Sequence, residues 1–206
     1  MQRKVVQQLH NVVTVSECSR QDIAQDFGIQ PAGISLVPNG IDTEVFKPVE
    51  GVRRKPLQLM ATASADAPLK GLRYLLRSYA RLLKNYPELE LLVIGQPRPG
   101  GDTERLLRKL GLSERVKFVS GISTDEMVHY YAQATIAVVP SVYEGFGLPA
   151  GEAMACGVPV VSTDGGALPE VVADAGVIVP ARDVSAMTTA IAELLDNDAR
   201  REELGR

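Results

Sequence analysis

The chain alternates between short apolar runs and longer segments whose apolar residues recur every three or four positions. The apolar runs lack polar alternation, which is typical of strands covered on both faces of a sheet. From residue 57 onward they predict strands at residues 57–62, 90–94, 116–119, 135–139, 158–162 and 177–179. Because helical segments separate these runs, we expect an α/β fold built on a doubly wound parallel sheet.

The segment after the first of these strands has the clearest helical pattern. Its apolar residues predict one buried helix face, made by Leu72, Leu75, Leu76, Tyr79, Leu82, Leu83 and Tyr86. Ser123 and Glu126 have the spacing of a capping box and predict the start of a helix that runs to about residue 133. Further helices are predicted at residues 103–110, 149–156 and 184–195.

Residues before 57 predict two short strands and a helix. Two short β-branched runs, 11–15 and 34–37, read as strands. Between them, Ser16 is placed to cap a helix that Gly28 ends. A charged linker, residues 49–56, follows.

Composition narrows the class of protein. Of the 206 residues, 45% are hydrophobic and 23% charged, as in an ordinary globular protein. A net charge of −3 gives no reason to expect a nucleic-acid partner. Two cysteines make no disulfide framework, no signal peptide opens the chain, and no apolar stretch approaches the ~20 residues of a membrane span. We therefore expect a cytoplasmic protein, with at most weak contact with a membrane surface.

Residues 140–163, PSVYEGFGLPAGEAMACGVPVVST, carry the candidate chemistry. A buried strand ends at Pro140, a loop with Gly145 and Gly147 follows, and Pro149 suits the first turn of a helix. The free N–H groups and the dipole at such a helix start favour an anion. Ligands of doubly wound sheets bind at this carboxyl edge of the strands.

Two carboxylates accompany this predicted anion site. Glu144 lies in the loop and Glu152 in the predicted first turn of the helix. Carboxylates beside a phosphate are suited to accept hydrogen bonds from sugar hydroxyls. The alternative for Glu152 is an acidic residue that the helix dipole favours at this position.

The same stretch resembles the signature of retaining glycosyltransferases with the GT-B fold, group 1 or family 4 type. That signature is a glutamate, seven residues and a second glutamate, here Glu144 and Glu152. The resemblance extends to VPNGID at residues 37–42, to Lys70-Gly71 and to Gly165-Gly166. It covers nearly the whole chain, but it implies only the C-terminal, Rossmann-like half of such an enzyme.

The resemblance implies roles for individual residues. Glu144 and Lys70 would be the catalytic pair, with Glu144 on the donor sugar and Lys70 on the donor diphosphate; without the resemblance, Lys70 reads as a solvated surface lysine. The residues implied to bind the nucleotide sugar are Glu152 (through the ribose), Phe146, Gly147 and Leu148 (through backbone N–H groups), Gly95 and Gly121 (around the base), and Ser64.

One departure from the family pattern concerns the diphosphate. The family usually has an arginine five or six residues before the lysine, where this chain has Ser64 and Ala65. Three alternatives are open: Ser64 with backbone amides suffices, another basic residue such as Arg73 replaces the arginine, or the diphosphate binds more weakly. Arg73 qualifies only if its side chain turns back toward the loop.

The resemblance also implies a division of the protein. Residues 1–15 would be a remnant of an N-terminal acceptor domain and its linker, and residues 16–206 the nucleotide-sugar-binding domain. We expect transfer of a hexose from a nucleoside diphosphate sugar, with retention, to a sugar or lipid-linked acceptor held by the N-terminal domain. No metal or cofactor is expected, and the chain alone is expected to bind donor without useful transfer.

Two other interpretations remain open at this point. A non-catalytic nucleotide-binding or interaction module of the same fold is favoured by the missing arginine. A dinucleotide-dependent oxidoreductase is disfavoured because no GxGxxG opens a helix after the first full strand. The sequence does not specify the sugar, the base or the acceptor.

Overall fold

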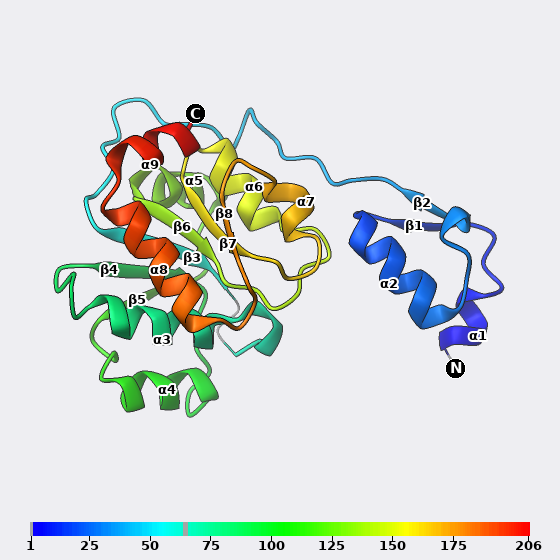
Figure 1. Ribbon diagram of the computed structural model, residues 1–206, viewed down its shortest axis with the longest axis horizontal. Coiled ribbons are helices and arrows are strands. Elements are labelled where there is room, and N and C mark those ends of the chain that lie inside the picture. Colours follow the sequence, from blue (N-terminus) through cyan, green and yellow to red (C-terminus); the bar gives the residue numbers. More distant parts are fainter. Residues whose placement is uncertain (1, 64–65) are drawn as a thin grey trace.

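The computed structural model describes residues 2–63 and 66–206 (Figure 1). Its main body is a six-stranded parallel sheet in the order β5-β4-β3-β6-β7-β8. The strands are β3 Gln58–Thr62, β4 Glu90–Ile94, β5 Val116–Val119, β6 Ile136–Val139, β7 Val160–Thr163 and β8 Val177–Val179. The expected doubly wound parallel sheet is therefore confirmed, and the chain reverses its direction of winding between β3 and β6.

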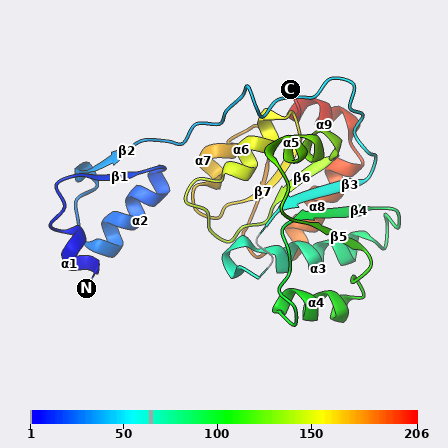
Figure 2. The same ribbon diagram turned by 180° about the vertical axis from the view of Figure 1, so that it is seen from behind.

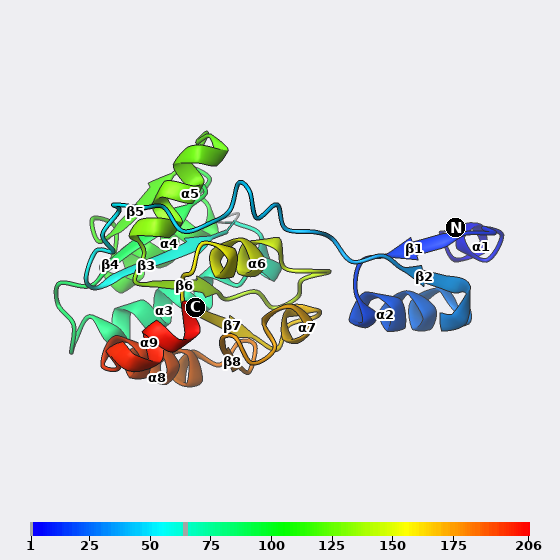
Figure 3. The same ribbon diagram turned by 90° about the horizontal axis from the view of Figure 1, so that it is seen from above.

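Helices cover both faces of this sheet (Figure 3). One face carries α3 Leu72–Leu82, α4 Asp102–Leu110 and α8 Val184–Leu195, and the other carries α5 Thr124–Gln133, α6 Leu148–Ala155 and α7 Leu168–Val172. Successive strand residues face opposite layers, so Leu59 packs with α3 and Met60 with α5. This explains why the strands are apolar without alternation.

The predicted apolar face of α3 is buried as expected. Five of its residues, Leu72, Leu75, Leu76, Tyr79 and Leu82, are at most 2% exposed. The single proton of the Tyr79 hydroxyl is shared between the carbonyl oxygens of Leu89 (2.7 Å) and Arg115 (3.0 Å), which satisfies its polar end. The helix ends at Leu82 rather than Tyr86, and the last two residues of the predicted face pack against the same core from the following turn.

A small unit precedes the main body (Figures 1 and 2). It consists of α1 Gln2–Val6, β1 Val12–Thr14, α2 Glu17–Phe27 and β2 Ile34–Leu36, with β1 and β2 paired in parallel. Ser16 caps α2 through its side chain, and Gly28 closes the helix in the left-handed conformation, as the sequence predicted. A domain boundary at residues 15–16 remains a prediction.

The chain ends in α9 Asp198–Leu204, which follows α8. Among the described residues, no helix has both the length and the apolar character needed to cross a membrane.

Candidate functional site

The sheet topology places the candidate site beyond the carboxyl ends of β3 and β6, where the strand order reverses. Two segments meet there: the turn η2 Pro68–Lys70, which leads into α3, and the loop that follows β6. Both sequence-predicted catalytic residues lie in these segments. Lys70 is the last residue of η2, and Glu144 lies in the loop.

Lys70 and Glu144 contact each other directly. The Lys70 Nζ lies 2.8 Å and 3.0 Å from the two Glu144 carboxylate oxygens. Ser141 Oγ donates a further hydrogen bond of 2.8 Å to Glu144 Oε1. The Lys70 side chain is 35% exposed and that of Glu144 only 11%. The carboxylate is therefore fixed inside the loop, whereas the ammonium group remains open to an incoming anion.

A close backbone approach holds the two segments together. Val142 N–H donates a 2.7 Å hydrogen bond to the Leu69 carbonyl. Gly71 has φ +66°, and a Cβ at this position would lie 1.8 Å from the Pro140 carbonyl oxygen. Only glycine fits here, because both the backbone angle and the space exclude a side chain. In the Lys70-Gly71 pair, the lysine thus supplies the positive charge and the glycine allows the close backbone approach.

The glycine loop ends in the expected helix start. Gly147, at φ 107°, is the N-cap of α6, and Pro149 lies in the first turn. The backbone N–H groups of Phe146, Gly147 and Leu148 donate to no atom of the described part of the chain. Three free donors and a helix N-terminus therefore lie within four residues of Glu144.

Glu152 lies in the second turn of α6, and the prediction that placed it in the first turn was wrong. The helix begins one residue early, at Leu148, because Gly147 takes the left-handed cap position. The dipole effect fades beyond the first turn, which weakens the alternative that Glu152 serves only the helix. Its carboxylate instead accepts a 3.3 Å hydrogen bond from the hydroxyl of the buried Tyr131.

Burial raises the pKa of Glu152, and the Tyr131 hydrogen bond only partly opposes it. The folded chain therefore keeps this proton at pH values where the unfolded chain has lost it. We expect the free energy of unfolding to fall as pH rises from the ordinary value of 4.5 through the raised pKa. Glu152→Gln should remove this fall, as measured by urea unfolding between pH 4 and pH 8. Glu202→Gln, at an exposed position, is the control and should keep it.

A cavity of about 410 Å³ opens beside Lys70. Gly95 and Gln96 line it from the loop after β4, and Pro149 from the start of α6. The Tyr131 hydroxyl that bonds Glu152 also lies 3.4 Å from the Pro149 carbonyl, so Glu152 is joined to the cavity wall through one side chain. The structure thus gathers Lys70, Gly95 and the start of α6 around one space.

Gly121 lies next to this cavity rather than on it. Ser120 Oγ donates a 3.2 Å hydrogen bond to Gln96 Oε1, and Gly95 N–H donates one of 2.7 Å to the Val119 carbonyl. These bonds connect the turn at Gly121 to the loop at Gly95. The two segments implied to surround the base are therefore neighbours.

Arg98 is a residue of this cavity that the sequence analysis missed. Among the described residues, its guanidinium makes no hydrogen bond and no ion pair within 4 Å, although its charge acts on the nearby Asp66 carboxylate. Asp66 holds its backbone: the carboxylate accepts hydrogen bonds from the N–H groups of Arg98 (2.6 Å) and Thr103 (3.0 Å). Burial tends to raise the pKa of Asp66, but these bonds and the positive charge of Arg98 outweigh it and lower the pKa. The sequence did contain a signal for Arg98: it is a cationic residue between Pro97 and Pro99, in a loop at the carboxyl edge of the strands, where ligands of such sheets bind.

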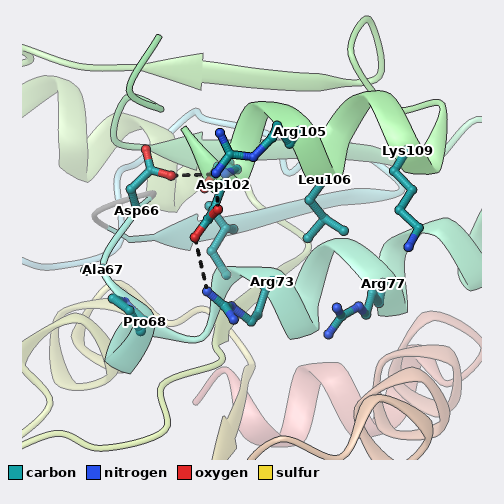
Figure 4. Close-up of a pocket in the computed structure, with 11 residues that line it drawn as sticks. Asp66, Ala67, Pro68, Arg73, Arg77, Asp102, Arg105, Leu106 and Lys109 are labelled. Carbon is teal, nitrogen blue, oxygen red and sulfur yellow. Dashed lines mark hydrogen bonds and ion pairs between the residues drawn. The ribbon is translucent and has the colours of Figure 1, made fainter. Parts of the chain in front are cut away.

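Arg73 does not fill the place of the missing family arginine. Figure 4 shows it pointing toward α4, where its guanidinium lies 4.0 Å from the Asp102 carboxylate. It lines a separate cavity of about 280 Å³ between α3 and α4. The side chain of Arg73 does not turn back to the diphosphate loop, so Arg73 does not qualify as the substitute.

Ser64, the other expected substitute, lies outside the described residues, as does Ala65. Within residues 2–63 and 66–206, no group of three His, Cys, Asp or Glu side chains is arranged to hold a metal ion.

Comparison with known proteins identifies the family. Residues 46–206 match the model of the glycosyl transferases group 1. An MMP alpha-(1->4)-mannosyltransferase from Mycolicibacterium hassiacum is 43% identical over 209 residues, which span 100% of this chain and 50% of that protein. A D-inositol 3-phosphate glycosyltransferase from Kribbella flavida is 31% identical over 100% of this chain and 53% of its own length. The chain thus spans about half the length of these relatives.

Solved structures agree with the fold. Sucrose-phosphate synthase from Thermosynechococcus elongatus has a TM-score of 0.83 and 28% identity over 100% of this chain and 54% of its own. The C-terminal domain of a group 1 glycosyl transferase from Francisella tularensis has a TM-score of 0.70 and 27% identity, over 81% of this chain and 93% of that domain. Anabaena HepE, solved with UDP and glucose, has a TM-score of 0.82 at 20% identity, over 95% of this chain and 56% of its own. The chain belongs to the group 1 glycosyl transferases and has the fold of the C-terminal half of a GT-B enzyme.

Proposed function

We propose that this chain is the donor-binding half of a retaining glycosyltransferase that transfers a hexose from a nucleoside diphosphate sugar. The observation that carries the proposal is the convergence of Lys70, Glu144 and the free N–H groups of residues 146–148 at the reversal point of the sheet. A diphosphate is the ligand that suits a cation beside a helix N-terminus. A carboxylate fixed next to it is suited to the hydroxyls of the attached sugar.

Each group has a distinct role in the proposed chemistry. Transfer leaves negative charge on the departing diphosphate, and Lys70, Arg98 and the start of α6 are placed to stabilise that charge. Glu144 orients the sugar through its hydroxyls, and Glu152 accepts hydrogen bonds from the ribose. Arg98 balances the charge of the donor diphosphate in place of the missing family arginine, a role for which the sequence analysis named Ser64 and Arg73 as candidates. The relatives named above transfer sugars, which supports the reaction class.

The proposed function also needs a binding site for the acceptor of the sugar. We propose that an N-terminal domain, of about the same length again, binds a sugar or lipid-linked acceptor across the cleft from Lys70. On its own, this chain then binds donor but transfers no sugar at a useful rate. Retention would be checked on the complete protein, by the anomeric proton coupling of the product in NMR spectra.

Calorimetric titration with UDP, GDP, ADP and their sugars tests the donor assignment. We expect one base to be preferred, and Glu152→Ala to weaken its binding by roughly tenfold, because hydrogen bonds from the ribose to a charged group are lost. Glu202→Ala removes the same charge at an exposed position and should leave the affinity unchanged. An affinity unaffected by Glu152→Ala would favour the non-catalytic module instead. No binding across the panel would contradict the proposal.

A further inference from the structure

The start of α2 is attached to the loop that carries Glu144. Ser16 Oγ and Ser19 Oγ donate hydrogen bonds of 2.7 Å and 3.1 Å to the same acceptor, the Gly145 carbonyl oxygen. Both serines are buried, at 3% and 8% exposed. Two hydroxyls three residues apart at the helix start thus hold one peptide group of the loop, across more than 120 residues of sequence.

A second attachment runs from the other side of the loop. The Glu170 carboxylate, on α7, accepts hydrogen bonds from the N–H groups of Glu17 (2.8 Å) and Cys18 (2.7 Å) at the start of α2. A carboxylate at this end of a helix is also favoured by the helix dipole. The segment before α7 is bound in turn to Glu144, whose carbonyl accepts a 2.9 Å hydrogen bond from Ala167 N–H. Helix α2 therefore contacts both segments that fix the Glu144 backbone.

The bonds to Gly145 determine the direction of a neighbouring donor. The Gly145 carbonyl and the Phe146 N–H belong to one peptide group, and in a trans peptide these two point in opposite directions. Because the carbonyl points to Ser16 and Ser19, the Phe146 N–H points away from α2. That N–H is the first of the three donors left free within the described residues. Gly145 and Gly147 flank it, so without an outside attachment this peptide would have many orientations.

We propose that Ser16 and Ser19 are positioning residues for the sugar end of the donor site. They fix the 145–146 peptide, and with it the Phe146 N–H and the position of Glu144, before the donor arrives. Preorganisation of this kind raises affinity by removing the ordering cost at the moment of binding. The inference rests on the proposed function, and it goes beyond the matched family region, because α2 lies before residue 46.

The test uses this chain with Ser16→Gly and Ser19→Ala combined. Glycine is chosen at position 16 because it is nearly as good a helix cap as serine, so α2 itself is preserved. Each of UDP-glucose, GDP-mannose and ADP-glucose is titrated beside its own nucleoside diphosphate. We expect the affinity for the accepted nucleotide sugar to fall roughly tenfold, and that for the diphosphate alone by less than about threefold. Gln21→Ala, exposed on the same helix, is the matched control and should change neither.

A spectroscopic measurement separates positioning from general stability. In ¹⁵N-labelled chain without ligand, we expect the amide signals of residues 144–147 to shift or broaden in the double variant and to stay unchanged in Gln21→Ala. Unchanged loop signals, or an equal loss of affinity for diphosphate and nucleotide sugar, would overturn the inference. A wild-type chain that binds no nucleotide sugar overturns the proposed function together with it. A variant that binds the sugar nucleotide as well as wild type overturns the inference alone.

Discussion

Replacing Lys70 with alanine is expected to lower the affinity of this chain for its nucleoside diphosphate by about 10- to 100-fold, since charge-assisted hydrogen bonds contribute about 1.5–3 kcal/mol. The loss has two sources. The diphosphate loses a cation that is still 35% exposed in the absence of ligand. In addition, the Glu144 carboxylate, 11% exposed, loses its counter-charge and then repels the incoming anion.

Two further variants separate these sources by calorimetry. Lys109→Ala removes the same charge from the exposed surface of α4 and should change the affinity little. Lys70→Ala combined with Glu144→Gln removes the unpaired carboxylate charge as well, so part of the diphosphate affinity should return. If Lys70→Ala bound the nucleoside diphosphate as tightly as Lys109→Ala, the proposed role of Lys70 would be contradicted.

Gly71→Ala is expected to destabilise the fold by about 2–5 kcal/mol, toward the upper end of that range. A left-handed non-glycine residue costs about 1–2 kcal/mol, and forcing atoms into filled space typically adds about 1–3 kcal/mol. The clash is severe here because the new Cβ would lie 1.8 Å from the Pro140 carbonyl oxygen, which is backbone and has little freedom to move. The same change would push the Lys70 turn away from the Glu144 loop.

Gly121→Ala is the matched control for the steric argument. Gly121 has φ +70°, close to the +66° of Gly71, but a Cβ there would meet no atom within 4 Å. Its destabilisation should therefore be limited to the backbone cost of about 1–2 kcal/mol. Urea unfolding of both variants gives the comparison. Equal losses would mean that the approach of residues 69–71 to residues 140–142 is less tight than the structure indicates.

The features that the sequence predicted correctly depend on neighbours within one turn or one strand. The capping box is an example: both the bond from Glu126 N–H to Ser123 Oγ and the return bond from Ser123 N–H to Glu126 are present. The buried face of α3 follows from helical spacing, and Ser16 and Gly28 define the two ends of α2. Each of these is local, so residue type and spacing are enough to specify it.

The placement of Glu152 shows where local information becomes insufficient. Pro149 was compatible with either of the first two helix positions, and only the left-handed Gly147 moved the helix start to Leu148. The Tyr131 hydroxyl that bonds Glu152 comes from α5, on a separate segment of the chain. Proximity of this kind depends on how α5 and α6 pack over the same sheet face, which spacing along the chain does not reveal.

Residue types and their spacing were enough to predict the class of fold, the helix and strand pattern and the glycine loop that ends in a helix start, and the resemblance added roles for the candidate residues Lys70, Glu144 and Glu152. Which side chains meet in space became visible in the folded chain alone. The tertiary structure joined Lys70 to Glu144, directed Arg73 to Asp102, bound Asp66 to the backbone of Arg98, and attached Ser16 and Ser19 to Gly145. The physical reason is that a serine at a helix cap or an aspartate in a loop has the same local pattern whatever it binds. Its distant partner is set by the strand order and by the helices that cross between the strands.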